Sequence, residues 1–245
     1  GELHSYLIGI TAGIFREADD LGDGELIDRI KDSAKQKGTG RWASIEALKQ
    51  GVDISMITSA CTARIMSNHL DEREKAWQLI HSPAVGLSPD KESFAAMVRE
   101  ALYTGKIIAY AQGFSLMQDA SRLYGWNLDL GKIASIFRAG CIIQAVFLND
   151  ITHAFEAEPK PENLIFDGFF LSRINEHQDS LRQAVSTGVM NGLPIPALCN
   201  AVSYLDEFRA KAAGANLIQA QRDCFGAHTY ERTDREGVFH HEWRW

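Results

Sequence analysis

The sequence has few cysteines, no excess of positive charge and no long apolar run, and each shortage excludes a class of protein. Its four cysteines are scattered without a CxxC pair, which argues against a zinc site or a dense disulfide framework. The formal net charge of -7 argues against a dedicated nucleic-acid binder, although a local cluster of cations can still hold a small anion. No apolar run approaches the roughly 18 residues of a membrane span. We therefore expect a cytoplasmic protein with neither nucleic-acid nor membrane partners.

The chain also lacks a segment that would bind a dinucleotide. Such a segment consists of a strand, a GxGxxG turn and a helix, because the glycines let the backbone approach the pyrophosphate. The nearest glycine-rich string, KGTG at residues 37–40, follows a predicted helix instead of a strand. No secretory signal pattern is found, and Gly1 runs directly into a predicted helix, so we expect a fragment of a longer protein.

Helical periodicity runs through most of the chain. At 245 residues and 45% apolar content, the chain can bury a sizeable core. β-branched residues nowhere alternate long enough to predict a sheet. The sequence predicts an all-α fold, whose first helix carries an apolar stripe formed by Leu3, Leu7, Ile10 and Ile14.

Two long antiparallel helices are predicted in the middle of the chain. The first begins at Ser88-Pro89-Asp90, which combines a capping hydroxyl, a proline suited to the first turn and an acid, and it ends at Gly125. The second is predicted over residues 130–157.

Asp129 can cap that second helix, and two prolines end it. Gly113 and Gly140 fall inside the two predicted helices at a cost of about 1 kcal/mol each relative to alanine, and we interpret them as points of close helix approach.

Shorter helices and a tail complete the predicted fold. The polar segment 25–36 is predicted to be helical, Ser44 is a plausible N-cap for the next helix, and residues 71–77 are predicted to form a charged turn. Further helices are predicted over residues 54–70, 166–190, 195–213 and 216–225. After Gly226 the composition turns polar, which predicts an extended C-terminal tail.

Four side chains are candidates for binding an anion. Lys37 lies in KGTG, which is either a flexible turn facing an anion or simply a helix C-cap whose glycines supply positive φ. Arg64 lies in a mostly apolar helix, where an arginine reaches solvent or pairs with an anion. Arg222 and His228 bracket a helix end and can together bond a phosphate, but a cation there can equally stabilise the helix dipole.

Other chemistry has little support in the residues. His240, His241 and Glu242 are adjacent, and neighbouring side chains outside a helix seldom point at one ion, so we predict no metal site. No arrangement typical of a catalytic triad or a reactive cysteine can be found, and we predict no catalytic residue in this chain.

Six segments, in the same order along nearly the whole chain, resemble the 6-phosphogluconate dehydrogenase family. They are DSAKQKGTGRW, ACTARIMSNHLDER, ALYTGKIIAYAQGFSLMQDASRLYGW, FRAGCIIQAVFLNDI, QAVSTGVMNGLPIPA and IQAQRDCFGAHTYE. The resemblance implies a C-terminal all-helical domain, residues 1–225, that serves dimerisation and substrate binding. It also implies a tail, residues 226–245, that reaches into the partner subunit of a homodimer, and an absent N-terminal dinucleotide-binding domain.

The resemblance also assigns the candidate cations. Lys37, Arg64, Arg222 and His228 match positions that hold 6-phosphogluconate in such enzymes, the last two across the dimer interface. Cys224 departs from the pattern, because family members often have an aromatic residue there.

The reaction implied is the oxidative decarboxylation of 6-phosphogluconate to ribulose 5-phosphate with reduction of NADP, in the pentose phosphate pathway and gluconate utilization. The family's catalytic lysine and glutamate belong to a segment that this sequence does not contain, so the chain alone is expected to be inactive and to bind no cofactor. Two alternatives remain: a non-catalytic helical dimerisation module, and a domain of a related β-hydroxyacid dehydrogenase with another substrate.

Overall fold

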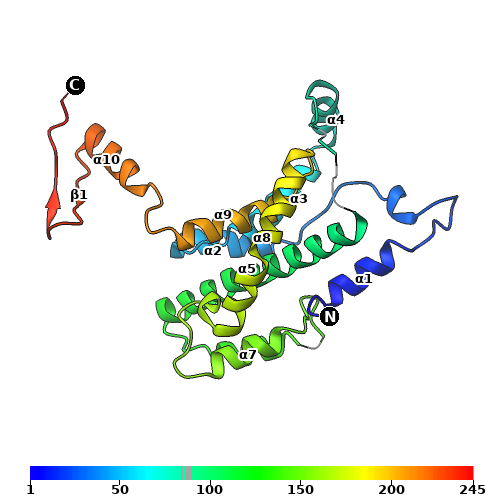
Figure 1. Ribbon diagram of the computed structural model, residues 1–245, viewed down its shortest axis with the longest axis horizontal. Coiled ribbons are helices and arrows are strands. Elements are labelled where there is room, and N and C mark those ends of the chain that lie inside the picture. The colour runs from blue at the N-terminus through cyan, green and yellow to red at the C-terminus, as the bar shows by residue number, and fades with distance from the viewer. Residues whose placement is uncertain (84, 87–89, 139, 245) are drawn as a thin grey trace. The chain divides into compact units, whose positions relative to one another are not determined.

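The computed structural model describes residues 1–83, 85–86, 90–138 and 140–244, which form two compact units, Gly1–Val202 and Ser203–Trp245. Figure 1 shows the elements of both units. In chain order they are α1 (Tyr6–Ile14), the 3-10 helix η1 (Leu26–Arg29), α2 (Thr39–Gln50), α3 (Ser55–Ser67), α4 (Leu70–Leu79), α5 (Lys91–Tyr124), α6 (Leu130–Ile136), α7 (Leu148–Glu156), the 3-10 helix η2 (Leu164–Phe166), α8 (Gly168–Met190), α9 (Pro196–Arg209), α10 (Ala215–Gly226), β1 (Tyr230–Glu231) and β2 (Val238–Phe239). The predicted helical fold is confirmed.

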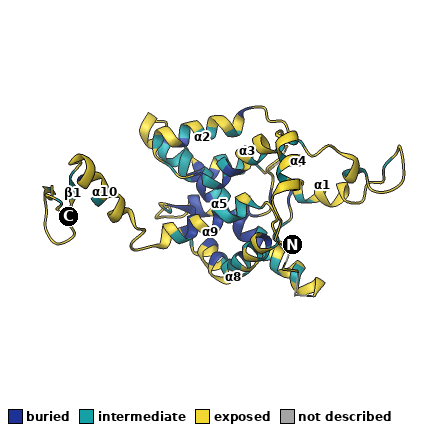
Figure 2. Cartoon of the chain, turned by 90° about the horizontal axis from the view of Figure 1, so that it is seen from above, coloured by how far each residue is buried: buried dark blue, intermediate teal, exposed yellow. Residues whose placement is uncertain are grey.

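The long helix α5 forms the centre of the first unit. Its N-cap is Asp90, whose carboxylate accepts hydrogen bonds from the amides of residues 92 and 93, and Gly125 ends it with a φ of 65°. Ser88 and Pro89, the first part of the predicted helix start, lie outside the described residues. Ile107, Ile108 and Ala111 are fully buried, and Figure 2 shows the buried residues gathered along α5.

The helix that packs antiparallel to α5 is α8, not the predicted helix 130–157. Just before α8, the Asn163 amide donates to Ser115 Oγ near the C-terminal part of α5 (3.0 Å). Further along α8, the Ser180 hydroxyl donates to Glu100 near the start of α5 (2.6 Å). The contacts therefore follow opposite orders along the two helices.

The predicted helix 130–157 is wrong, because it is interrupted between α6 and α7. Gly140 lies in this connection with a φ of 71°, a left-handed conformation that glycine adopts at little cost. The connection bonds to the N-terminal segment, where Tyr6 N donates to Gln144 O (3.2 Å) and Val146 N to His4 O (3.1 Å). Its apolar residues continue the helical rhythm, which explains the mistaken prediction.

The interpretation of the two glycines also needs correction. Among the described residues, a Cβ on Gly140 would meet nothing within 4 Å, and one on Gly113 would make an ordinary contact with Ile57. Close approach occurs elsewhere: a Cβ on Gly105 of α5 would lie 2.8 Å from a methyl group of Leu198.

Three local predictions before α5 are also wrong. Residues 25–36 form only η1 and then an extended segment, because Arg73 of α4 bonds the carbonyl and carboxylate of Asp32 and replaces the bonds of a helix. Residues 71–77 form part of α4 instead of a turn. Ser44 lies inside α2, where its hydroxyl donates to Gly40 O (2.9 Å), and the N-cap is Gly38.

The ends of the chain show two further differences. Leu3 precedes α1, and the remaining stripe residues Leu7, Ile10 and Ile14 are 46%, 39% and 43% exposed. In the second unit the predicted extended tail contains a small antiparallel hairpin, in which residue 230 of β1 pairs with residue 239 of β2. Strands of two residues are too short to produce a recognisable alternation.

Candidate functional site

A buried amide fixes the position of α3, the helix that carries Arg64. Gln112 of α5 is completely buried, and its Oε1 accepts a hydrogen bond from Met56 N (3.1 Å) in the first turn of α3. Its amide nitrogen donates to Ser55 Oγ (3.1 Å) and to Asp53 Oδ1 (3.3 Å). The start of α3 is thus tied to the central helix.

Helices α2 and α3 pack closely in opposite directions. The hydroxyl of Thr58 in α3 donates to Ser44 Oγ in α2 (3.0 Å). Gly40 lies one turn before Ser44, and Cys61 lies one turn after Thr58. A Cβ on Gly40 would overlap Cys61 Sγ. The start of α2 therefore lies against the C-terminal half of α3.

The loop that carries Lys37 is held at both ends against the same part of α3. On one side, Ala34 N donates to Ser67 Oγ (2.9 Å) and Ala34 O accepts from Asn68 (3.1 Å). On the other side, Gly40 contacts α3 as described above. Arg64 lies between these two anchor points along α3. The structure therefore brings Lys37 and Arg64 to one end of the α2–α3 pair.

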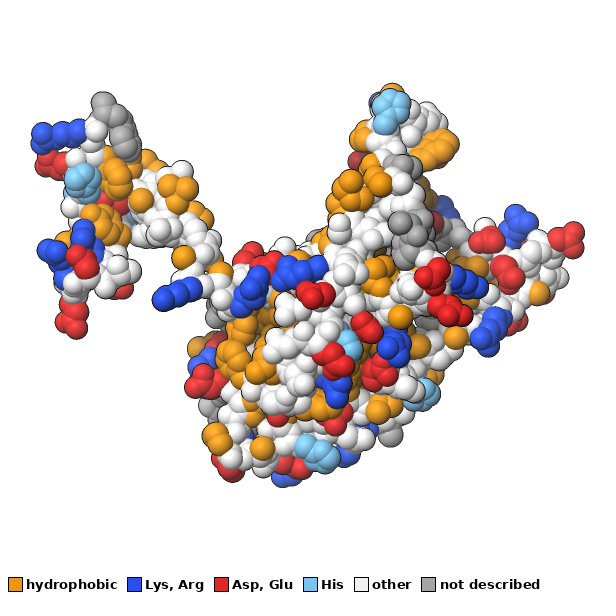
Figure 3. Space-filling view, viewed as in Figure 1, with side chains coloured by type: hydrophobic (Ala, Val, Ile, Leu, Met, Phe, Trp, Pro, Cys, Tyr) orange, Lys and Arg blue, Asp and Glu red, His pale blue; other side chains and the backbone are white. Residues whose placement is uncertain are grey.

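Both cations are exposed and available. Neither Lys37 nor Arg64 has a side-chain hydrogen bond or ion pair within the described part of the chain. Arginines such as Arg73, in contrast, pair with a carboxylate. On the face shown in Figure 3, lysines and arginines are interspersed with acids. An exposed arginine without an acid partner is free to bind an external anion.

The glycines of KGTG begin a helix and do not end one. Gly38 is the N-cap of α2 with a φ of 103°, and no side chain of the described residues caps the helix. The C-cap interpretation was therefore wrong. The first amides of α2 have no intrahelical acceptor, and the N-terminal end of a helix favours anions. Lys37 directly precedes this end.

The second unit holds Arg222 and His228 on one framework. Arg222 Nη1 donates to Gln219 Oε1 (3.1 Å), one turn earlier on α10. The Gln219 amide nitrogen in turn donates to Thr229 O (2.6 Å), directly after His228. The exposed His228 ring packs edge-on against Phe225, with 5.8 Å between ring centroids.

Beside Arg222, Asp223 is a fully buried carboxylate. Its two oxygens accept four hydrogen bonds, from the residues Thr229, His240, His241 and Trp243. These bonds outweigh the opposing effect of burial and hold the pKa of Asp223 well below its usual range. His240 is thus bonded to a carboxylate, and Glu242 pairs with Arg244. Within the described residues, no three His, Cys, Asp or Glu side chains gather as metal ligands would.

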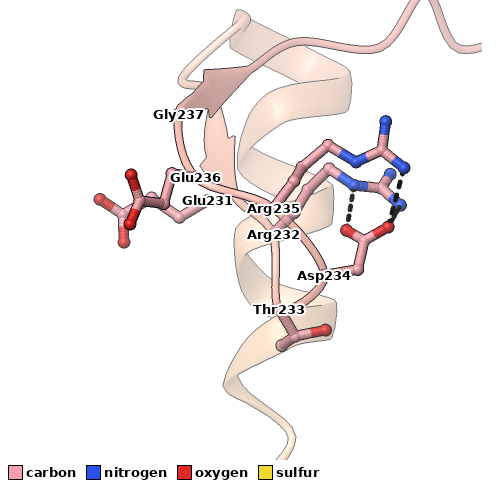
Figure 4. Close-up of a pocket in the computed structure, with 7 residues that line it drawn as sticks. All are labelled: Glu231, Arg232, Thr233, Asp234, Arg235, Glu236 and Gly237. Atoms are coloured by element: carbon pink, nitrogen blue, oxygen red, sulfur yellow. Dashed lines mark hydrogen bonds and ion pairs between the residues drawn. The ribbon is translucent and has the colours of Figure 1, made fainter.

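The hairpin turn of the second unit carries two more arginines, but an acid occupies them. Figure 4 shows Arg232 and Arg235 directed toward Asp234, while Glu231 and Glu236 point the opposite way. Arg232 makes two bonds to the Asp234 carboxylate (2.7 and 2.9 Å). The hollow at this turn, lined by residues 231–237, is therefore a weaker anion site than the pair Arg222 and His228.

Sequence reasoning missed the residues that organise the candidate cations. Gln112, Gly40 and Cys61 position the first pair, and Gln219 and Asp223 position the second. The available signal for Asp223 was a single acid in α10 followed by a tail rich in hydrogen-bond donors. The four cations belong to different units, Lys37 and Arg64 to the first and Arg222 and His228 to the second.

The helices of the described segments are all too short or too polar to span a lipid bilayer.

Comparison with known proteins identifies the family. The family model "6-phosphogluconate dehydrogenase, C-terminal domain" matches residues 1–243. The chain is 48% identical over 243 residues to "6-phosphogluconate dehydrogenase, decarboxylating" of Lactococcus lactis subsp. lactis (strain IL1403), covering 99% of this chain and 52% of that protein. The same figures apply to the protein of that name from Staphylococcus aureus (strain N315).

A solved structure agrees with these relatives. Plasmodium falciparum 6-phosphogluconate dehydrogenase, solved in its apo form and in complex with its cofactor NADP+ and its substrate 6-phosphogluconate, matches with a TM-score of 0.95 and 41% identity. The match covers 99% of this chain and 52% of that one. The chain thus spans about half the length of the relatives it matches. It belongs to the 6-phosphogluconate dehydrogenase family and corresponds to the C-terminal domain of the decarboxylating enzymes.

Proposed function

We propose that this chain supplies the cationic part of a 6-phosphogluconate site in a homodimeric, decarboxylating 6-phosphogluconate dehydrogenase. The observation that carries the proposal is the state of four side chains: Lys37, Arg64, Arg222 and His228 are exposed and have no carboxylate partner in the described segments. Family membership supports 6-phosphogluconate as the ligand proposed for these positions.

The chemistry of the ligand matches this set. 6-Phosphogluconate carries a phosphate dianion at one end and a carboxylate at the other, and both are bound best by charge-assisted donors. Arg222 can offer two parallel N–H groups to phosphate oxygens, while Lys37 lies before the uncapped start of α2. In this proposal Arg222 and His228 of one subunit complete the site of its partner, and the protein acts in the cytoplasm.

The described residues do not fit NADP. A dinucleotide fold needs a strand that leads through a glycine-rich turn into a helix. The strands in the described segments are the two-residue β1 and β2 of the C-terminal hairpin, and neither leads into a helix. The oxidation step and the reduction of NADP are therefore assigned to the rest of the complete protein, and the isolated chain is proposed to be inactive.

Calorimetry tests the substrate proposal directly. We expect 6-phosphogluconate to bind the complete protein that carries this chain, and Arg222→Ala to weaken binding about tenfold or more, because a charge-assisted hydrogen bond contributes about 1.5–3 kcal/mol. Lys37→Ala is expected to act in the same direction. The control is Lys132→Ala, an exposed lysine that pairs with Asp129 in the first turn of α6 (3.0 Å).

The outcomes separate the alternatives. No binding by the wild-type protein would favour a non-catalytic dimerisation module. Preferred binding of another hydroxy acid, insensitive to Arg222→Ala, would favour a related β-hydroxyacid dehydrogenase. Equal losses for Lys132→Ala and Arg222→Ala would show a general effect of charge, not a site.

A further inference from the structure

His228 lies between two residues with unusual backbone conformations. Ala227 has a φ of 49° and Thr229 a φ of 62°, in the left-handed region that residues with a side chain seldom adopt. Such conformations persist only where the surroundings hold them. The position of His228 therefore depends on whatever fixes its two neighbours.

Asp223 fixes both neighbours. Ala227 N donates to the backbone carbonyl of Asp223 (2.8 Å), and Thr229 N donates to Asp223 Oδ1 (3.0 Å). The loop is also closely packed, since a Cβ on Gly226 would lie 2.8 Å from His228 Nε2. One residue thus holds the backbone on either side of the candidate phosphate ligand.

The same carboxylate also holds the end of the chain. His240 Nδ1 lies 2.8 Å from Oδ1, Trp243 Nε1 donates to Oδ2 (2.9 Å), and His241 N donates to Oδ2 (3.1 Å). An ionised carboxylate can only accept hydrogen bonds, and here all four of its acceptor positions are used. The C-terminal segment and the His228 loop therefore share one buried anchor.

Arg222 is connected to this anchor through neutral groups. Its guanidinium donates to Gln219, which donates to Thr229 O, while Thr229 N donates to Asp223. Although Arg222 and Asp223 are adjacent in sequence, they form no ion pair, since the carboxylate is directed at the tail. The acid thereby leaves the positive charge of Arg222 available for a ligand.

We propose that Asp223 is a positioning residue that couples docking of residues 240–243 to the placement of His228 and Arg222 for the phosphorylated substrate. The proposal rests on the proposed function for its ligand, and on the contacts above for its geometry. It assigns to the C-terminal segment a direct role in shaping the substrate site.

Asp223→Asn is the sharpest variant, because it keeps the shape of the side chain but replaces one accepting oxygen with an NH2 group. The new NH2 group then faces either the donors on Oδ1, from Thr229 and His240, or the donors on Oδ2, from His241 and Trp243. Hydrogen bonds on that side of the residue must break. The matched control is Asp234→Asn in the exposed hairpin turn, where only surface pairs with Arg232 and Arg235 are lost. Trp243→Phe removes one donor and serves as a milder variant should Asp223→Asn fold poorly.

Two measurements on the complete protein test the proposal. Hydrogen exchange of residues 226–244 is expected to rise in Asp223→Asn, to rise less in Trp243→Phe, and to stay at the wild-type level outside the turn in Asp234→Asn. The KM for 6-phosphogluconate is expected to rise about tenfold in Asp223→Asn with a smaller change in kcat. In a His228→Ala background, Asp223→Asn is expected to add a smaller rise in KM than it causes alone, because it acts in part through that residue.

The contrary results are distinct. Unchanged exchange in Asp223→Asn, or a fall in kcat with unchanged KM, would overturn the positioning role. Full additivity with His228→Ala would reduce Asp223 to a general structural residue and also overturn the proposal. A wild-type protein that does not bind 6-phosphogluconate would instead overturn the proposed function, and the site role of Asp223 with it.

Discussion

At the scale of single residues, the contact between Gly40 and Cys61 decides how closely α2 and α3 pack. A methyl group on Gly40 would overlap the Cys61 sulfur, so we expect Gly40→Ala to lower the free energy of unfolding by about 1–3 kcal/mol. Adding Cys61→Ala removes the obstacle and is expected to restore much of the loss. Urea denaturation of the single and double variants measures this.

Gly9→Ala is the control for that experiment. Gly9 lies inside α1, and a Cβ there would meet no atom of the described segments within 4 Å. Without a clash, the helix propensity of alanine is expected to raise the free energy of unfolding by about 0.5–1 kcal/mol. Equal destabilisation by Gly9→Ala and Gly40→Ala would contradict the packing argument.

Tyr110 of α5 is expected to make the stability of the fold depend on pH above 10. Burial, with a smaller contribution from Cys141, raises the pKa of Tyr110 to about 12, and its hydroxyl donates to Ile143 O (2.5 Å). Because the folded pKa lies above the unfolded value of 10.0, the contribution to stability is complete below pH 10.0 and is lost as the pH rises toward about 12.

Tyr110→Phe isolates this effect. The variant is expected to be less stable than the wild type at neutral pH, because Ile143 O loses its donor, and the difference is expected to shrink as the pH rises above 10. The urea midpoint of both proteins at several alkaline pH values provides the test. A constant difference across that range would show that Tyr110 does not titrate with unfolding.

At the scale of helices, Gln112 connects α5 to the helix that carries Arg64. Gln112→Ala leaves Met56 N buried without its acceptor and opens a small cavity, so we expect a loss of about 2–4 kcal/mol. Gln78→Ala changes an exposed glutamine of α4 that bonds Glu74 at the surface, and it is expected to cost less than about 0.5 kcal/mol. Thermal unfolding of both variants, with 6-phosphogluconate titration of each, would show whether α3 and the anion site loosen together.

Helix prediction from the sequence succeeded where the local signals and the tertiary structure agree. Between Asp90 and Gly125 an uninterrupted apolar rhythm and a left-handed glycine point to the same helix, and α5 follows them, although Asp90 is its N-cap and not, as predicted, an acid of its first turn. Residues 130–157 failed because Gly140 bends the chain while the apolar rhythm continues. The prediction for residues 25–36 failed because Arg73, far along the sequence, bonds Asp32 in the extended segment that follows η1.

The candidate site shows the same division. Its four cations could be named from the family pattern, and their role in binding stays a prediction. Their supports could not, since His240 is 17 residues beyond Asp223 and no local pattern indicates that the two meet. Acids are mostly exposed, so a sequence gives no reason to expect that Asp223, next to Arg222, is buried and bonded to the tail.

At the scale of the whole molecule, the proposed site draws on two subunits, which mixed dimers can test. Arg64→Ala and Arg222→Ala are each expected to abolish most activity of the complete protein. If Arg64 and Arg222 act across the interface, randomly mixed dimers of the two variants are expected to recover about a quarter of the wild-type activity, because half are mixed and each of those has one intact site.

No recovery after confirmed subunit exchange would place both arginines in the site of a single chain. Dimers mixed from Arg64→Ala and wild type serve as a control that one altered subunit leaves the other site intact, and they are expected to show about half of the wild-type activity. Sedimentation at several concentrations would test the dimer itself. The half-exposed apolar stripe of α1 is a surface that a second subunit could cover.

The loop from Ala34 to Gly40 has a thermodynamic consequence. Its ends are already fastened to α3 and Gly38 has a left-handed conformation, so we expect an arriving anion to order mainly the side chain of Lys37. Ordering one flexible side chain costs about 0.5–1.5 kcal/mol, far less than ordering a loop of the same length. We therefore expect this part of the site to bind with little loss of backbone entropy, which is the advantage of a receptor that is shaped before its ligand arrives.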